Sequence, residues 1–168
     1  MAVTYNYCHT ISFFNMKLII KYSLIEELKE SVNVLKNLSE YENLRSFIKP
    51  SFKSILTFAV NKNAGIKHTQ KVWLNSKPAV EKAFKDLGIK DPGVMPCFLH
   101  GMSCEGWFNT DDNSIHVRFP ENGGDKELLN TIVHEIIHLA TYDKKYDYSE
   151  REEIVDNYLA KPQLKKFL

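Results

Sequence analysis

The chain has 168 residues, of which 43% are hydrophobic and 26% are charged, and its formal net charge at neutral pH is +1. These values are ordinary for a globular protein with its own core, and the near-zero charge argues against a nucleic-acid-binding protein or one held at an acidic membrane surface. The sequence has no run of about 18 apolar residues, so we expect no membrane span. The three cysteines, Cys8, Cys97 and Cys104, form no close pair, which argues against a disulfide framework and favours a reduced, cytoplasmic setting.

Helical patterns dominate the first half of the chain. Ser23 and Glu26 form a capping-box pattern ahead of apolar residues at helical spacing. Ser39 and Glu42 repeat this pattern ahead of a shorter helix, and Gly88 stands where a helix commonly ends. We expect helices over 24–38, between Ser39 and Pro50, around 52–59 and over 79–87.

The second half of the chain contains strands and then helices. The expected elements are a strand near 95–102, a hairpin with strands at 105–109 and 114–119, a helix over 125–141 and a last helix at about 149–160 that is ended by Pro162. In the second hairpin strand, apolar residues alternate with His116 and Arg118, so one face of the sheet should be buried. This order of elements favours an α+β fold with a small mixed or antiparallel sheet, on which the helix over 125–141 packs.

We expect one domain over 1–168, because the sequence shows no internal repeat and no low-complexity linker. Within it, residues 16–90 should form a helical N-terminal part, and residues 95–160 should form the core that carries the function. Residues 1–15 precede a second candidate start at Met16 and are expected to form a loosely held extension.

The helix expected over 125–141 carries two histidines on the side away from its apolar stripe. The stripe consists of Leu128, Leu129, Ile132, Val133, Ile136 and Ile137. His134 and His138 lie one turn apart on nearly the opposite side, close enough for both imidazoles to reach one ion. A core histidine would lie within the stripe, so we prefer metal binding to an accidental pair on an exposed helix face. His134-Glu135-x-x-His138 is the H-E-x-x-H pattern of zinc sites, in which Glu135 can take a proton from a water and pass it to a leaving amine.

A zinc site of this kind needs a third protein ligand, and the helix expected at 149–160 offers several acids. At about 100° per residue, Glu152 lies at the edge of the apolar face of this helix, whereas Glu153 points almost directly away. We therefore prefer Glu152 as the ligand and keep Glu153 as the alternative. Asp156 lies one turn further along on the same side and is expected to accept a hydrogen bond from a histidine N–H, that of His134.

Glu152 also has a competing structural role. Ser149 and Glu152 match the capping-box pattern, in which the glutamate would only close off the start of the helix. Asp147 with Glu150 offers an equivalent cap two residues earlier, and this cap would leave Glu152 available to a metal ion.

His134-Glu135-x-x-His138, a short loop and Glu152-x-x-x-Asp156 together resemble the gluzincin metallopeptidases, and the compact form is similar to their minimal single-domain members, the minigluzincins. The resemblance covers the expected core and not the helical N-terminal part. The chain lacks the glycine and the third histidine that continue the metzincin motif. The resemblance implies a Zn²⁺-dependent peptidase with His134, His138 and Glu152 as ligands and Glu135 as the general base.

The same resemblance implies a cleft under a sheet edge, to which an extended peptide adds as a strand. The implied edge is 105–109, with Gly106 and Trp107 close to the substrate. The missing side chain of Gly106 would let another backbone approach, whereas a core aromatic is an equal alternative for Trp107. The candidate donors to the oxyanion are Tyr142, Tyr146 and Tyr148, among which no spacing rule chooses, and for each of them packing is the preferred alternative. The other histidines, His9, His68, His100 and His116, are expected at the surface or as hydrogen-bonded core residues.

Two functional classes compete. The first is a zinc metalloendopeptidase, and the second is a catalytically silent zincin-like domain that binds a peptide or protein or serves in regulation. Glu135 favours the enzyme, because a structural zinc site closes with four protein ligands and needs no base beside the metal. A helical domain without metal is a third hypothesis. In a subsidiary hypothesis, a terminal segment, either residues 1–15 or the tail over 160–168, lies across the cleft and blocks it.

Overall fold

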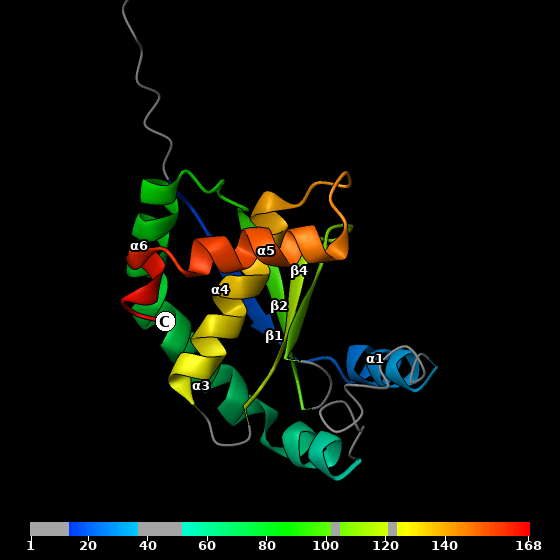
Figure 1. Ribbon diagram of the computed structural model, residues 1–168. Helices are drawn as coiled ribbons and strands as arrows, with labels where there is room; N and C mark the ends of the chain where they lie inside the picture. The colour runs from blue at the N-terminus through cyan, green and yellow to red at the C-terminus, as the bar shows by residue number, and fades with distance from the viewer. Residues whose placement is uncertain (1–13, 37–51, 102–104, 121–123) are drawn as a thin grey trace, which may run out of the picture.

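The computed structural model describes residues 14–36, 52–101, 105–120 and 124–168, and Figure 1 shows how these parts are arranged. Their fold is α+β, as expected, with one four-stranded sheet and five helices among the described residues. Most of the expected N-terminal extension, and the helix expected between Ser39 and Pro50, lie outside the described residues. No described helix is both long enough and apolar enough to cross a membrane.

The sheet is mixed, with its strands in the order β1-β2-β4-β3. The strands are β1 (Lys17–Lys21), β2 (Val94–His100), β3 (Gly106–Asn109) and β4 (Ser114–Arg118). β1 and β4 run parallel to β2, whereas β3 and β4 form the expected antiparallel hairpin. The turn between them places Asn113 at a φ of 54°, which asparagine tolerates better than most residues. β3 therefore forms one edge of the sheet.

β1 is an element that the sequence does not reveal. Its five residues, KLIIK, stand directly before the first helix without the turn residues that usually bound a strand. Its pairing partner β2 lies far along the chain, so no local sequence pattern predicts that the two strands pair. The main-chain N–H of Lys17 donates to the carbonyl of Gly93 (2.9 Å) where the two strands begin.

α3 (Phe52–Leu87) is a single helix of 36 residues, and the two helices expected around 52–59 and over 79–87 are both parts of it. Pro78 lies inside α3, although proline lacks the N–H of a regular helical turn and commonly ends a helix. The helix continues because apolar residues on both sides of the proline are buried in the core. They include Val72, Trp73, Val80 and Phe84. The expected stop at Gly88 is confirmed by its φ of +68° and by hydrogen bonds that return to the last turn.

α4 (Asp125–Thr141) has the bounds that the sequence predicts, and it packs on the hairpin of β3 and β4. Its apolar stripe is buried against one face of the sheet. The facing residues are Cys97, Leu99, Ile115 and Val117, all fully buried. α3 packs against β1, β2 and α4 and so covers the same core next to α4.

Cys97 is a fully buried core residue, and burial raises the pKa of its thiol. Cys8 and Cys104 lie outside the described residues. The cytoplasmic setting that the cysteines favour stays a prediction.

Two helices complete the described chain. α5 (Tyr148–Leu159) crosses α4, and α6 (Pro162–Lys165) packs against α3 (Figure 1). The helix expected at about 149–160 ends before Pro162, as expected. Pro162 also begins α6, because the first position of a helix needs no N–H donor. Leu164 is fully buried and fixes the short helix to the core.

The second face of β4 is also buried at His116, in addition to the one buried face that the alternation predicts. The side chain of His116 is 6% exposed. It stacks on Phe98 of β2 (centroids 5.0 Å apart) and on Trp107 of β3 (4.4 Å), its register neighbours on the two sides. A row of three rings therefore crosses the sheet on the face opposite α4.

A buried polar chain joins this face to α1 (Leu24–Lys36), whose expected cap at Ser23 is confirmed by a hydrogen bond from the Glu26 N–H. The carboxylate of Glu27 is fully buried, and its Oε2 lies 3.0 Å from Nδ1 of His100. Nε2 of His100 lies 2.9 Å from Nδ1 of His116. With both imidazoles neutral, one arrangement of protons satisfies both contacts. The Nδ1–H of His100 donates to Glu27, and the Nδ1–H of His116 donates to Nε2 of His100. His100 and His116 are thus hydrogen-bonded core residues, one of the two expected alternatives.

Acid should weaken the fold through His116. Burial, and next the imidazole of His100, lower the pKa of His116 to about 4, against a smaller opposite effect of Asp112 and Glu26. Between about pH 6.5 and pH 4, the unfolded chain binds a proton that the folded protein excludes, so the free energy of unfolding falls as the pH falls through this range. We expect a contribution of at most about 3 kcal/mol from this group.

The measurement is the free energy of unfolding in urea at several pH values for the wild type and His116→Asn. Asparagine keeps a hydrogen-bonding group near the Nδ1 position but does not titrate. The variant should be less stable at pH 7 and should lose less stability between pH 6.5 and 4. Parallel pH profiles would show that His116 is not the titrating group.

Candidate metal centre

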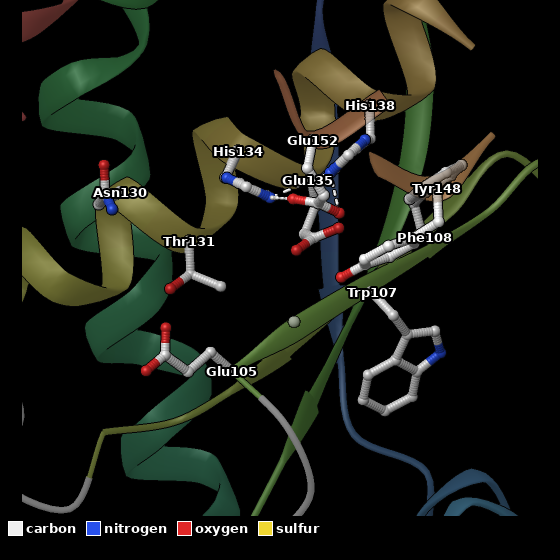
Figure 2. A pocket seen from close by; sticks show the side chains of 11 residues that line it. Glu105, Trp107, Phe108, Asn130, Thr131, His134, Glu135, His138, Tyr148 and Glu152 are labelled. Atoms are coloured by element: carbon white, nitrogen blue, oxygen red, sulfur yellow. Dashed lines mark hydrogen bonds and ion pairs between the residues drawn. The ribbon is translucent and has the colours of Figure 1, made fainter. Parts of the chain in front are cut away.

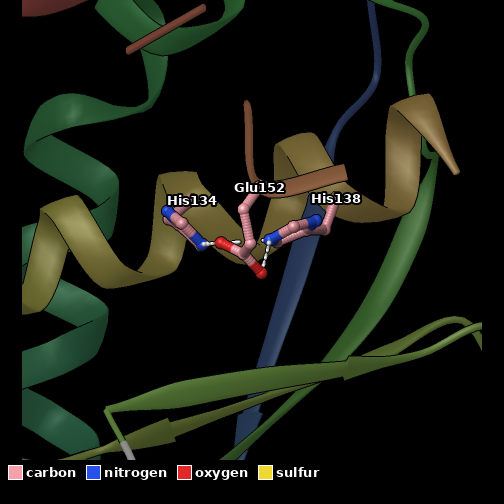
Figure 3. Close-up of side chains that lie close together, drawn as sticks. All are labelled: His134, His138 and Glu152. Atoms are coloured by element: carbon pink, nitrogen blue, oxygen red, sulfur yellow. Dashed lines mark hydrogen bonds and ion pairs between the residues drawn. The ribbon is translucent and has the colours of Figure 1, made fainter. Parts of the chain in front are cut away.

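α4 and α5 bring three metal-ligating side chains to one point, as Figure 3 shows. Nε2 of His134 lies 3.0 Å from Nε2 of His138. Glu152 Oε2 lies 3.4 Å from the nitrogen of His134, and Oε1 lies 3.3 Å from that of His138. The residues that the sequence singles out as ligands are therefore neighbours in space.

These separations fit a tetrahedral zinc ion. Ligand atoms held at about 2.0 to 2.1 Å from such an ion lie about 3.3 Å from one another. Two imidazoles and one carboxylate are also ligands that zinc accepts, and three protein ligands leave one position for water or substrate. Burial, and next the imidazole of His134, lower the pKa of His138, which favours the neutral imidazole that a metal ligand must be.

Glu152 is available because another pair caps the helix. The Asp147 side chain accepts from the Glu150 N–H, and the Glu150 side chain accepts from the Asp147 N–H, each at 2.9 Å. This is the earlier of the two expected capping boxes, and α5 begins directly after it. Glu152 consequently faces the histidines, while Glu153 is exposed.

Asp156 does not meet the expectation placed on it. Its side chain is exposed, and among the described residues no hydrogen bond joins it to His134. α5 crosses α4 instead of running along it (Figure 1), so helical spacing alone does not place Asp156 beside His134.

An aromatic ring contacts one of the ligands instead. The ring of Phe108 on β3 stacks on His138, with centroids 4.8 Å apart and planes 11° from parallel. The sequence gives no signal for this contact beyond the alternation that turns Phe108 to the same side of β3 as Gly106.

The expected general base, Glu135, lies in the same cavity as the ligands. Its side chain is only 4% exposed. Burial, and to a smaller extent the carboxylate of Glu152, raise its pKa to about 8. A carboxylate that is buried beside another carboxylate is stabilised when it takes up a proton or lies next to a cation.

Gly106 lies at the site, but for a different reason from the one expected. A Cβ atom built on Gly106 would lie 2.6 Å from Oε1 of Glu135 and 2.8 Å from Cγ2 of Thr131. The missing side chain therefore makes room for two residues of α4.

Trp107 presents its ring to the other face of the sheet. Its indole lies 4.6 Å from the His100 ring and 4.4 Å from the His116 ring, measured between centroids. Figure 2 shows the indole pointing away from the histidines and carboxylates of the site. The side chain thus follows the core alternative, although Trp107 belongs to the strand that forms one wall of the cavity.

The cavity has a volume of about 320 Å³ and lies between β3, α4 and α5. Its lining consists of Glu105, Gly106, Trp107, Phe108, Asn130, Thr131, His134, Glu135, His138, Tyr148 and Glu152. Of the three candidate tyrosines, only Tyr148 is part of this lining, and its phenolic oxygen points towards the carboxylates (Figure 2). Tyr142 packs edge-on against Phe108, and Tyr146 lies beside Lys145.

The tail of the chain lies elsewhere. α6 packs against α3 and contributes nothing to the described lining, so the hypothesis of a blocking tail gains no support from the described residues. The other blocking segment in that hypothesis, residues 1–15, lies mostly outside the described residues.

His68 is half-buried with its Nε2 2.9 Å from a carboxylate oxygen of Asp125, and His9 is outside the described residues.

The sequence matches no model of a known protein family, no curated protein and no solved structure. The likeness to gluzincins therefore stays a prediction that rests on the motif and on the third carboxylate.

The ligand assignment predicts different metal affinities for two neighbouring glutamates. Glu152→Gln replaces a charged ligand with a neutral amide and should weaken zinc binding by at least about 100-fold, the upper end of the loss typical for residues that only support a ligand. Glu153→Gln makes the same change in charge one residue later, at an exposed position, and should bind zinc as the wild type does. Competition with a chromophoric chelator measures both affinities. Equal affinities for the two variants would contradict the assignment.

Proposed function

We propose that this protein is a zinc-dependent metallopeptidase that hydrolyses peptide bonds of an extended peptide or protein segment. The observation that supports it best is the carboxylate of Glu135, which lies beside three converging ligand side chains in one cavity. A structural zinc site has no use for a buried, uncoordinated carboxylate at this place.

Glu135 carries the proton in this proposal. When bound, zinc would polarise the scissile carbonyl and lower the pKa of the attacking water. Glu135 accepts the proton of that water and then donates it to the leaving amine.

The substrate would bind along β3. This strand is the last of the sheet and forms one wall of the cavity. An extended peptide can add to such an edge through main-chain hydrogen bonds, which hold it independently of its side chains. The scissile bond would then lie between the strand and the turn of α4 that carries His134 and Glu135.

Tyr148 is the best-placed donor to the oxyanion. It lines the cavity and directs its hydroxyl group towards the carboxylates (Figure 2). A phenol O–H near the scissile carbonyl would stabilise the negative charge that develops on its oxygen in the transition state.

The first test removes the base and keeps the ligands. Glu135→Gln preserves size but cannot accept a proton, so kcat for peptide hydrolysis should fall by at least about 100-fold while zinc stays bound. A mixed-peptide digest read by mass spectrometry, together with the zinc content of each protein, measures both effects. Cleavage by the variant at the wild-type rate would sink the role of Glu135. A zinc-loaded wild type that binds peptides without cleaving them would favour a silent binding module.

The second test concerns the phenol. Tyr148→Phe removes one hydroxyl group and should lower kcat about 100-fold with little change in KM, since the donor acts mainly in the transition state. Tyr146→Phe is the matched control, because this tyrosine is outside the cavity lining, and it should leave kcat unchanged. If both variants have the same kcat, Tyr148 does not stabilise the oxyanion.

A further inference from the structure

We propose that Gly106 is a positioning residue for Glu135, because only a residue without a side chain leaves the carboxylate its place between β3 and α4. The inference rests on the proposed function and adds a specific requirement to it. It concerns a residue of β3 that has no side chain and so takes no part in the chemistry itself.

The close approach involves two successive turns of α4. A Cβ on Gly106 would lie 2.6 Å from Oε1 and 3.0 Å from Cδ of Glu135, and 2.8 Å from Cγ2 of Thr131. Contacts below 3.0 Å are closer than Cβ atoms in proteins normally allow, so something must move. Gly106 has no positive φ, and its backbone conformation therefore does not explain the glycine.

The surroundings decide which group moves. On the face away from α4, the neighbouring Trp107 packs on the rings of His100 and His116, so the strand cannot retreat easily. Thr131 is tied to its own helix by a hydrogen bond from Oγ1 to the Glu127 carbonyl (3.1 Å). The side chain of Glu135 has the most freedom to rotate, and alanine at position 106 should therefore displace its carboxylate first.

Displacement of a base is costly for catalysis even when binding is intact. Misplacing a reacting group by about 1 Å can cost about 100-fold in rate. Alanine at Gly106 should accordingly lower kcat and leave zinc affinity nearly unchanged, because the ligands come from other residues.

The structure offers a matched control at the start of α4. A Cβ on Gly124 would lie 3.6 Å from its nearest neighbour, an oxygen of Glu127, which is an ordinary contact. Gly124→Ala should keep the wild-type kcat, whereas Gly106→Ala should reduce it about 100-fold. In the Glu135→Gln background, Gly106→Ala should cause no further loss of kcat, because no base is left to displace. A general distortion of the site would instead lower zinc affinity and remain additive. Wild-type kcat in Gly106→Ala, or a full further loss in that background, would overturn the inference.

A second readout needs no activity. The melting temperature of metal-free protein is measured for Gly106→Ala in the wild-type background and in the Glu135→Asp background, where the carboxylate is one methylene shorter. Glycine-to-alanine changes without a clash tend to stabilise slightly through the unfolded state, so a drop in melting temperature reports the contact. The drop should be smaller with aspartate at position 135.

These outcomes separate the two proposals. Equal drops in both backgrounds, with an active wild type, would overturn the role of Gly106 and leave the proposed function standing. A wild type that cleaves no peptide would overturn the proposed function and the positioning role with it, even where a smaller drop with aspartate still supports the contact.

Discussion

The close packing of α4 on the edge strand β3 is the constraint on which the site depends. It buries Glu135 against Gly106, and it brings Phe108 onto the ring of His138. Burying a carboxylate is unfavourable unless a proton or a cation compensates it, and the raised pKa of Glu135 expresses that cost. The same contact therefore fixes where the carboxylate stands and increases its tendency to take up a proton.

β3 is held from both of its faces. Gly106 and Phe108 face α4, while Trp107 between them lies on the imidazoles of the opposite face. Those imidazoles belong to the buried chain of hydrogen bonds that ends at Glu27 of α1. A helix on one side of the sheet therefore supports β3, which forms one wall of the cavity on the other side of the sheet. Alternation along a strand, which normally separates core from solvent, here separates the cavity from a polar core.

The sequence predicts what depends on neighbours in the chain. The bounds of α4, the pair of imidazoles one turn apart, and the cap that leaves Glu152 available all follow from residues within a few turns of one another. The contact of Glu27 with His100 spans 73 residues, and no local pattern indicates it, so alternation in β4 predicts one buried face and gives no sign that the other is buried too. The displacement of Asp156 has the same origin, because helical spacing fixes the direction of a side chain but not the angle at which two helices cross.

The weakest element of the site is also the one that supplies its carboxylate ligand. α5 has twelve residues, and Val155 is the only one of them that is fully buried, so packing alone holds it loosely compared with α4. Its capping box stabilises the helix itself but not its place against α4. A cation shared by His134, His138 and Glu152 would join the two helices directly, since metal-binding free energy is also folding free energy when ligands come from separate elements. If the site binds a metal, docking of α5 and affinity for that metal would be two aspects of one equilibrium, and a change that loosens α5 should weaken metal binding without touching a ligand.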